Sequence, residues 1–170
     1  MFIYNGSVIL LFTASTLYHA TAATKRKQQL RVLDHISIYY LIAGTYTPVC
    51  IWMLADSRGI LLLWLVWGIA FFGTLLKLFF TGRFETFSLL LYAIMGWLIV
   101  LDWTYLRSHI SKSAGFYLAL GGGFYTIGIL FYASRRIPYN HFIWHCFVLA
   151  GAFCHWLLID TLLSEALAKL

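Results

Sequence analysis

The chain has 170 residues, of which 62% are hydrophobic and only 11% are charged, with a formal net charge of +6. Soluble domains average about a quarter charged residues, so this composition excludes a soluble globular domain and indicates a protein surrounded by lipid. Basic residues cluster in short breaks between apolar segments, as expected for membrane topology, and no nucleic-acid-binding module is recognisable. We therefore expect membrane lipid, and no nucleic acid, as a partner.

Apolar segments follow one another along the whole sequence, and a membrane-spanning helix needs about 20 such residues. In chain order they predict six transmembrane helices, at about 2–22, 33–54, 59–80, 86–102, 114–133 and 141–162. The breaks between them are too short to hold a second domain. The sequence therefore predicts an all-α fold, a polytopic integral membrane helical bundle, formed by a single domain over residues 1–170.

The first, third and fifth breaks carry more Lys and Arg than the others, which predicts that they face the cytoplasm. Lys77, just before the third break, is expected to extend its ammonium group to the membrane interface. The basic residues of these breaks are Lys25, Arg26, Lys27, Arg31, Arg83, Arg135 and Arg136.

Polar residues from three distant segments are expected at this same cytoplasmic level. His19 ends the first segment, and Ser15 lies one turn deeper on the same helix face. Asp34 opens the second segment. His141 and His145 lie four residues apart at the start of the sixth, so they share a face. Ionisable residues inside a membrane are costly, and their convergence indicates a functional site.

These residue types suit a metal centre. Three neutral imidazoles, from His19, His141 and His145, would leave one tetrahedral position open, which is the pattern of catalytic rather than structural zinc. Such a site needs a carboxylate to offset the charge and accept a proton from water. Asp34 is the candidate, because Glu85 is expected in a loop and the other acidic residues lie toward the outside. Ser15 could hydrogen-bond either Asp34 or the bound water.

Plainer interpretations remain for individual residues. A single histidine in a helix is more often hydrogen-bonded to a neighbour than a ligand, and the positive end of a helix dipole near His141 does not favour a cation. His155 lies about 15 Å further along the helix than His145, so we expect a hydrogen bond inside the bundle. The run Gly121–Gly123 is expected to allow close helix approach.

Three motifs carry a resemblance to a known family. They are "STLYH" (Ser15–His19), "DHISIYYLIAGTYTP" (Asp34–Pro48) and "NHFIWHCFVLAGAFCH" (Asn140–His155). They resemble the hallmark motifs of the hemolysin III family, which is grouped with the progestin and adipoQ receptors, including the adiponectin receptors. The resemblance implies a bundle of seven helices with a buried zinc near the cytoplasmic face.

The resemblance also assigns roles to individual residues. The family's zinc ligands map by motif onto His19, His141 and His145. Its motif aspartate, which holds the zinc-bound water, maps onto Asp34, and its motif serine maps onto Ser15. Because only six segments are present and the first takes the place of the family's second helix, the chain is expected to lack the first transmembrane helix.

Three functions are compatible with these observations. The first is a zinc-dependent hydrolase of lipid amides, ceramidase-like by resemblance, with the substrate entering from the bilayer and Asp34 accepting a proton. The second is a pore-forming hemolysin or channel without hydrolytic activity. The third is a receptor-like module with structural zinc. The expected location is the bacterial inner (plasma) membrane with the metal toward the cytoplasm, and the oligomeric state stays open.

Overall fold

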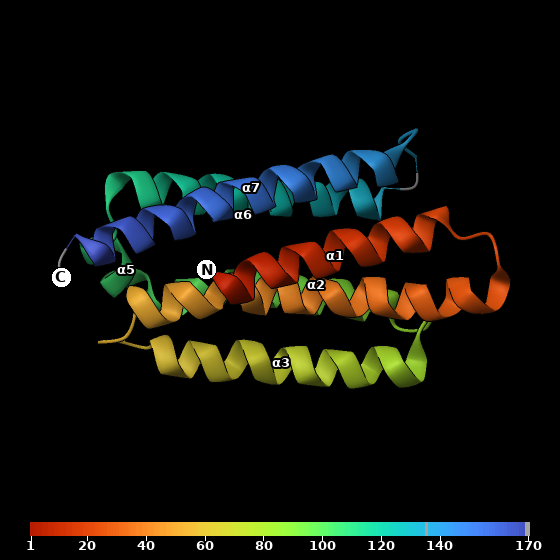
Figure 1. Ribbon diagram of the computed structural model, residues 1–170, viewed down its shortest axis with the longest axis horizontal. Helices are drawn as coiled ribbons and strands as arrows, with labels where there is room; N and C mark the ends of the chain where they lie inside the picture. The colour runs from red at the N-terminus through yellow and green to blue at the C-terminus, as the bar shows by residue number, and fades with distance from the viewer. Residues whose placement is uncertain (135, 169–170) are drawn as a thin grey trace. The chain divides into compact units, whose positions relative to one another are not determined.

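The computed structural model of the protein describes residues 1–134 and 136–168, and all regular structure within them is helical (Figure 1). This confirms the predicted all-α fold. The elements are α1 (Phe2–Ala20), α2 (Thr24–Trp52), α3 (Gly59–Phe80), α4 (Glu85–Trp97), η1 (Leu98–Asp102), α5 (Trp103–His109), α6 (Lys112–Ala133) and α7 (Asn140–Leu167). Arg135, one of the basic residues of the fifth break, lies outside the described residues.

Four helical segments are long and apolar enough to cross a membrane. They are Gly59–Phe80, Glu85–His109, Lys112–Ala133 and Asn140–Leu167, and they correspond to the last four predicted spans. Large apolar side chains such as Trp64 and Phe79 are about three-quarters exposed, at 74% and 73%, which suits contact with lipid. α1 and α2 occupy the first two expected places, and that they also cross the membrane stays a prediction.

The start of the second helix differs from the prediction. α2 begins at Thr24, so the basic stretch expected to be a break is helical, and Asp34 lies inside α2 rather than at its beginning. Lys, Arg and Gln are good helix formers, so a polar sequence can continue a helix beyond the membrane. Apolar content locates the membrane-spanning part of a helix, but it does not locate the helix end.

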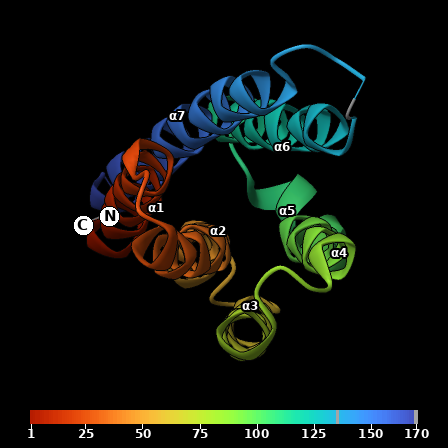
Figure 2. The ribbon, with the colours of Figure 1, turned by 90° about the vertical axis from the view of Figure 1, so that its right-hand side faces the viewer.

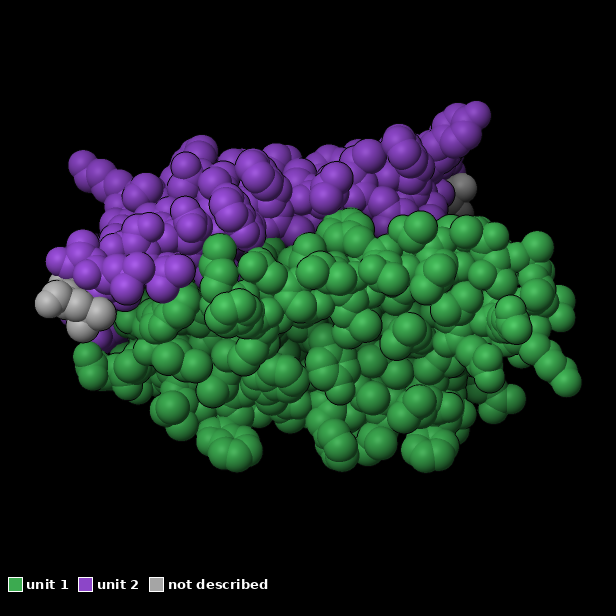
Figure 3. Space-filling model, viewed as in Figure 1, with its two compact units in different colours: residues 1–103 green, residues 104–170 purple. Residues whose placement is uncertain are grey.

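The chain divides into two compact units, Met1–Trp103 (unit 1) and Thr104–Leu170 (unit 2), which Figure 3 distinguishes by colour. In unit 1, α2 packs against both α1 and α3, as Figure 2 shows. Gly44 makes the first contact close, since a Cβ there would lie 2.5 Å from Ser7 Oγ on α1. Small residues at helix contacts are typical of membrane bundles. In unit 2, α6 and α7 form an extensively packed pair. The single domain stays a prediction.

The segment Glu85–His109 is a broken helix. α4 gives way to the 3₁₀ turn η1 and then to α5. The Tyr46 hydroxyl accepts a hydrogen bond from the Ile99 N–H at 2.8 Å and donates one to the Gly96 carbonyl at 3.1 Å. Irregular backbone at membrane depth needs such internal partners. Tyr46, from α2, therefore supports the change of helix type.

Candidate metal centre

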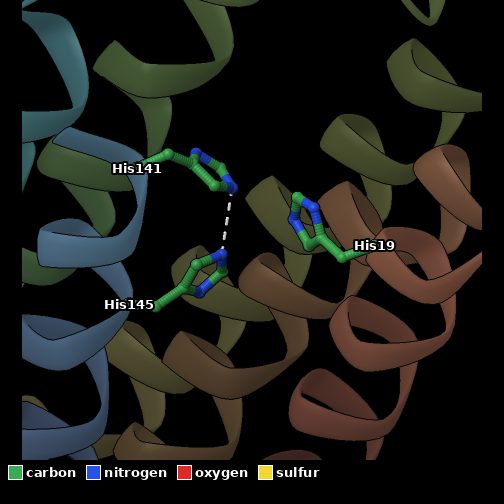
Figure 4. Close-up of side chains that lie close together, drawn as sticks. All are labelled: His19, His141 and His145. Atoms are coloured by element: carbon green, nitrogen blue, oxygen red, sulfur yellow. Dashed lines mark hydrogen bonds between the residues drawn. The ribbon is translucent and has the colours of Figure 1, made fainter. Parts of the chain in front are cut away.

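Two histidines face each other on the first turns of α7. The Nε2 atoms of His141 and His145 lie 3.0 Å apart, and the two rings stand almost perpendicular, at 87° (Figure 4). This confirms that the four-residue spacing puts both rings on one face. Two nitrogens bound tetrahedrally to one zinc are about 3.3 Å apart, given Zn–N bonds of about 2.0–2.1 Å. The pair can therefore share a hydrogen bond or chelate an ion after a small ring movement.

The helix carrying this pair is anchored to α6. The Asn140 side-chain amide donates to the Phe131 carbonyl at 3.4 Å, and the ring of Tyr132 packs on buried Trp144 with centroids 5.2 Å apart. Tyr139, immediately before α7, has a left-handed backbone with φ of 56°. These contacts fix the start of α7, so the histidine pair is held by the α6–α7 hairpin.

Unit 1 brings together the other three predicted site residues. Ser15 and Asp34 are buried, at 6% and 8% exposure, and the Ser15 hydroxyl lies near enough to the Asp34 carboxyl group to interact with it. His19, in the last turn of α1, is close enough to interact electrostatically with Asp34. Ser37 donates its hydroxyl to the Asp34 backbone carbonyl at 2.6 Å, which fixes the local turn of α2. A buried carboxylate with a hydroxyl donor and an imidazole beside it can accept a proton from water.

Unit 1 also contains a charged cluster that was not predicted from the sequence. Lys77 was predicted to extend to the interface, and this is wrong, because its side chain is only 1% exposed and its Nζ lies 2.8 Å from Glu85 Oε2. The prediction of a loop position for Glu85 is also wrong, since it is the first residue of α4. The sequence feature that could have indicated this ion pair is the short break between Lys77 and Glu85, which carry opposite charges.

A second buried carboxylate, that of Asp102, binds the start of α3. Its oxygens accept hydrogen bonds from Ser57 Oγ at 2.8 Å and from the Arg58 N–H at 3.0 Å. The Arg58 guanidinium in turn donates to the Leu101 carbonyl at 2.7 Å. Asp102 is among the acidic residues expected toward the outside, and it ends η1 with 6% exposure. Its role is to satisfy backbone donors at a helix end.

His155 lies in unit 2, further along α7, with 8% exposure. It packs against α6, beside the Leu118 backbone and the Tyr125 ring, whose centroid is 5.3 Å away. Neither ring nitrogen makes a hydrogen bond of standard geometry within the described residues, although Leu118 lies within weaker reach. Gly121 makes room for the ring, because a Cβ there would lie 2.4 Å from His155 Cδ2. The expected close approach at the glycine run is confirmed at this position.

Comparison with known proteins agrees with the motif resemblance. The sequence profile of the family described as "Haemolysin-III related" matches residues 1–156. The "Hemolysin-3 homolog" of Bacillus subtilis (strain 168) is 41% identical over 150 residues, covering 88% of this chain and 70% of that protein. "Hemolysin-3" of Bacillus cereus is 42% identical, covering 88% and 68%. The human "Monocyte to macrophage differentiation factor" is 30% identical, covering 91% and 66%. No solved structure matches significantly.

Proposed function

The chain belongs to the haemolysin-III related family and is an integral membrane protein, and on that premise we propose that His19, His141 and His145 hold one zinc ion. The observation that carries the proposal is the 3.0 Å approach of the two Nε2 atoms on α7, which suits chelation of a single ion. His19 of unit 1 is proposed as the third ligand because the motif STLYH resembles the family motif that carries a zinc ligand at this position. Three imidazoles without a fourth protein ligand are typical of catalytic zinc.

We propose hydrolysis of a lipid amide as the reaction. Zinc held there would supply Lewis-acid activation of water and of the scissile carbonyl. The Asp34 carboxylate accepts a proton from the attacking water, and the nearby Ser15 hydroxyl helps to orient that carboxylate. Asp34 then returns the proton to the departing amine nitrogen as the C–N bond breaks. Water and amide thus give a carboxylic acid and an amine, with no other reactant.

A lipid substrate suits the surroundings of the site. The helices expose large apolar side chains, including Phe142 between the two histidines of α7, at 68% exposure. A substrate with long acyl chains could approach from the bilayer along such surfaces. Ceramides combine acyl chains with one amide bond, so a ceramidase-like activity is the specific form of the proposal.

Metal analysis of the purified protein tests the site. We expect about one zinc per chain in the wild type and a loss of at least tenfold in affinity in His19→Ala and His145→Ala, because each removes one of three ligands. His109→Ala, an exposed histidine on α5, is the matched control and should keep the metal. A wild-type protein without zinc, or ligand variants that retain it, would contradict the proposal.

The reaction is tested separately with Asp34→Asn. This variant keeps the shape of the side chain but cannot accept the proton, so it should keep zinc and lose about 10²–10⁴-fold in hydrolysis of a ceramide in nanodiscs. Product formation would be followed by mass spectrometry of the released fatty acid. Unchanged turnover in Asp34→Asn would remove the assigned role of Asp34, and absence of turnover in wild type would reject the ceramidase-like form.

The printed names of the two Bacillus relatives favour a second candidate, a pore-forming hemolysin. Release of a dye from liposomes without hydrolysis, persisting in His141→Ala, would support a pore that needs no metal. A third candidate is a receptor-like module with structural zinc. In that case metal removal would lower the unfolding temperature, and no hydrolysis product would form from any lipid.

The location of the site is part of the same proposal. Bacterial relatives and the basic residues Lys25–Lys27, at the start of α2, and Arg83 favour the inner membrane, with the metal toward the cytoplasm. A cysteine placed at Thr24 in a variant without the native thiols should react with membrane-permeant but not with impermeant reagents in intact cells. Reaction with the impermeant reagent would reverse the orientation.

A further inference from the structure

A charged cluster lies where α2, α3 and α4 meet in unit 1, and none of its residues belongs to the proposed metal site. Its centre is the Glu85 carboxylate. Oε2 lies 2.8 Å from Lys77 Nζ and 3.5 Å from His35 Nδ1. Oε1 accepts hydrogen bonds at 3.2 Å from Arg31 Nη2 and from the Gly82 N–H. One carboxylate thus accepts hydrogen bonds from Lys77, Arg31 and the Gly82 N–H, with the His35 ring beside it.

The charges of this cluster do not balance. Glu85 contributes one negative charge, while Lys77 and Arg31 contribute two positive charges. Lys77 lies in the last turn of the apolar helix α3, and an unneutralised charge beside the hydrocarbon region is costly. A buried ion pair is stable only when its charges and donors are well matched. The cluster therefore carries one excess positive charge, which a further anion would neutralise.

The members of the cluster differ in exposure. The Lys77 side chain is 1% exposed, whereas the side chains of Arg31 and Glu85 are 39% and 33% exposed. Arg31 donates to Glu85 through Nη2. Its other terminal nitrogen, Nη1, faces the turn at Gly82 and would lie 3.7 Å from a Cβ placed on that glycine. Gly82 has φ of +86° and no side chain to cover this side. Exposed Arg83 follows it.

We propose that this open side binds a phosphate group, contributed by an anionic lipid headgroup or by free phosphate. Arg31 supplies the planar set of N–H donors that suits phosphate oxygens, and buried Lys77 supplies the excess charge behind it. Arg83 adds a second positive charge at the rim. Basic pockets between membrane helices bind lipid headgroups in this manner. The site is separate from the histidines and does not depend on the proposed hydrolysis.

The test uses the full-length protein in nanodiscs of phosphatidylcholine. Binding of short-chain phosphatidylglycerol and of inorganic phosphate is measured separately by the shift in unfolding temperature across a titration. We expect saturable stabilisation by one or both ligands, and Arg31→Gln should weaken it roughly fivefold or more. Stabilisation by phosphatidylglycerol alone assigns the site to lipid, and stabilisation by both assigns it to the phosphate group itself.

Two variants distinguish binding at this specific site from non-specific attraction of anions to a basic surface. Arg26→Gln removes the same charge from an exposed position on α2 and should leave the affinity within about twofold. Glu85→Gln removes the internal anion, so it should bind the same ligands more tightly and depend on them more for stability. Absence of saturable binding, or equal weakening in Arg31→Gln and Arg26→Gln, would overturn the proposal. If Glu85→Gln fails to fold, the comparison of the two arginine variants still decides.

Discussion

Gly121 on α6 is a position where helix packing leaves no room for a side chain. A Cβ there would lie 2.4 Å from His155 Cδ2, while nothing lies within 4 Å of the corresponding position at neighbouring Gly122. We predict that Gly121→Ala lowers the free energy of unfolding by about 1–3 kcal/mol through overpacking. Gly122→Ala should be neutral or slightly stabilising, because alanine favours the helix. Thermal unfolding in detergent would compare them, and equal effects would contradict this account.

Individual residues also show which features the sequence could provide. His141 and His145 were predicted to face each other from their spacing within one helix, and the 3.0 Å distance between their Nε2 atoms confirms this. The burial of Lys77 could not be predicted from spacing within its own helix, because it depends on the Glu85 carboxylate of another helix. The same holds for Ser15 and Asp34, whose contact joins α1 to α2. Their shared level was predictable, but a hydrogen bond between them was only one of the alternatives.

At the level of helices, the charged cluster predicts an asymmetry between two substitutions. Glu85→Gln leaves the Lys77 ammonium buried without its carboxylate, so it should destabilise the protein by about 2–4 kcal/mol. Lys77→Met replaces the buried charge by an apolar chain of similar length and leaves Glu85 paired with Arg31. Its cost should be about 1 kcal/mol or less. Urea or thermal unfolding in phosphatidylcholine nanodiscs, without added anion, measures both. A larger cost for Lys77→Met would contradict the argument.

The broken helix between α4 and α5 supports a second prediction at this level. Tyr46→Phe removes the partner of the Ile99 N–H and of the Gly96 carbonyl, which should cost about 1–3 kcal/mol. Hydrogen exchange of the Ile99 amide should accelerate at least tenfold if the break opens locally. Tyr117→Phe is the control, since Tyr117 lies on α6 and takes no part in the hydrogen bonds to Ile99 and Gly96. Unchanged exchange at Ile99 would show that the hydroxyl does not support η1.

Helix positions were largely predictable, and helix ends were not. Each predicted apolar segment is helical, although 86–102 spans both α4 and η1, because about 20 apolar residues have few alternatives in a membrane. The early start of α2 and the 3₁₀ turn at Leu98–Asp102 were missed. The first depends on helix propensity outside the apolar stretch, and the second depends on a tyrosine hydroxyl from a different helix. Neither leaves a periodic signal in its own segment.

At the scale of the whole molecule, the proposed zinc site predicts that the stabilities of the two units are coupled. His19 belongs to unit 1, and His141 and His145 belong to unit 2. If all three bound the proposed ion, it would stabilise the folded protein by mass action and would connect the two units through coordinate bonds. Chelation should therefore lower the unfolding temperature of the wild type by several degrees and have little effect on His19→Ala, which has already lost the ion.

Hydrogen exchange can establish whether the link exists. His19→Ala changes a residue of α1, yet we predict faster exchange in the first turns of α7, matching the effect of chelation on the wild type. The physical reason is that the two α7 histidines lose the ion that holds their rings together, and local opening then becomes easier. His109→Ala should change neither region. If His19→Ala left α7 exchange as in the metal-loaded wild type, His19 would not be a ligand, and any metal on α7 would be bound by the histidine pair alone.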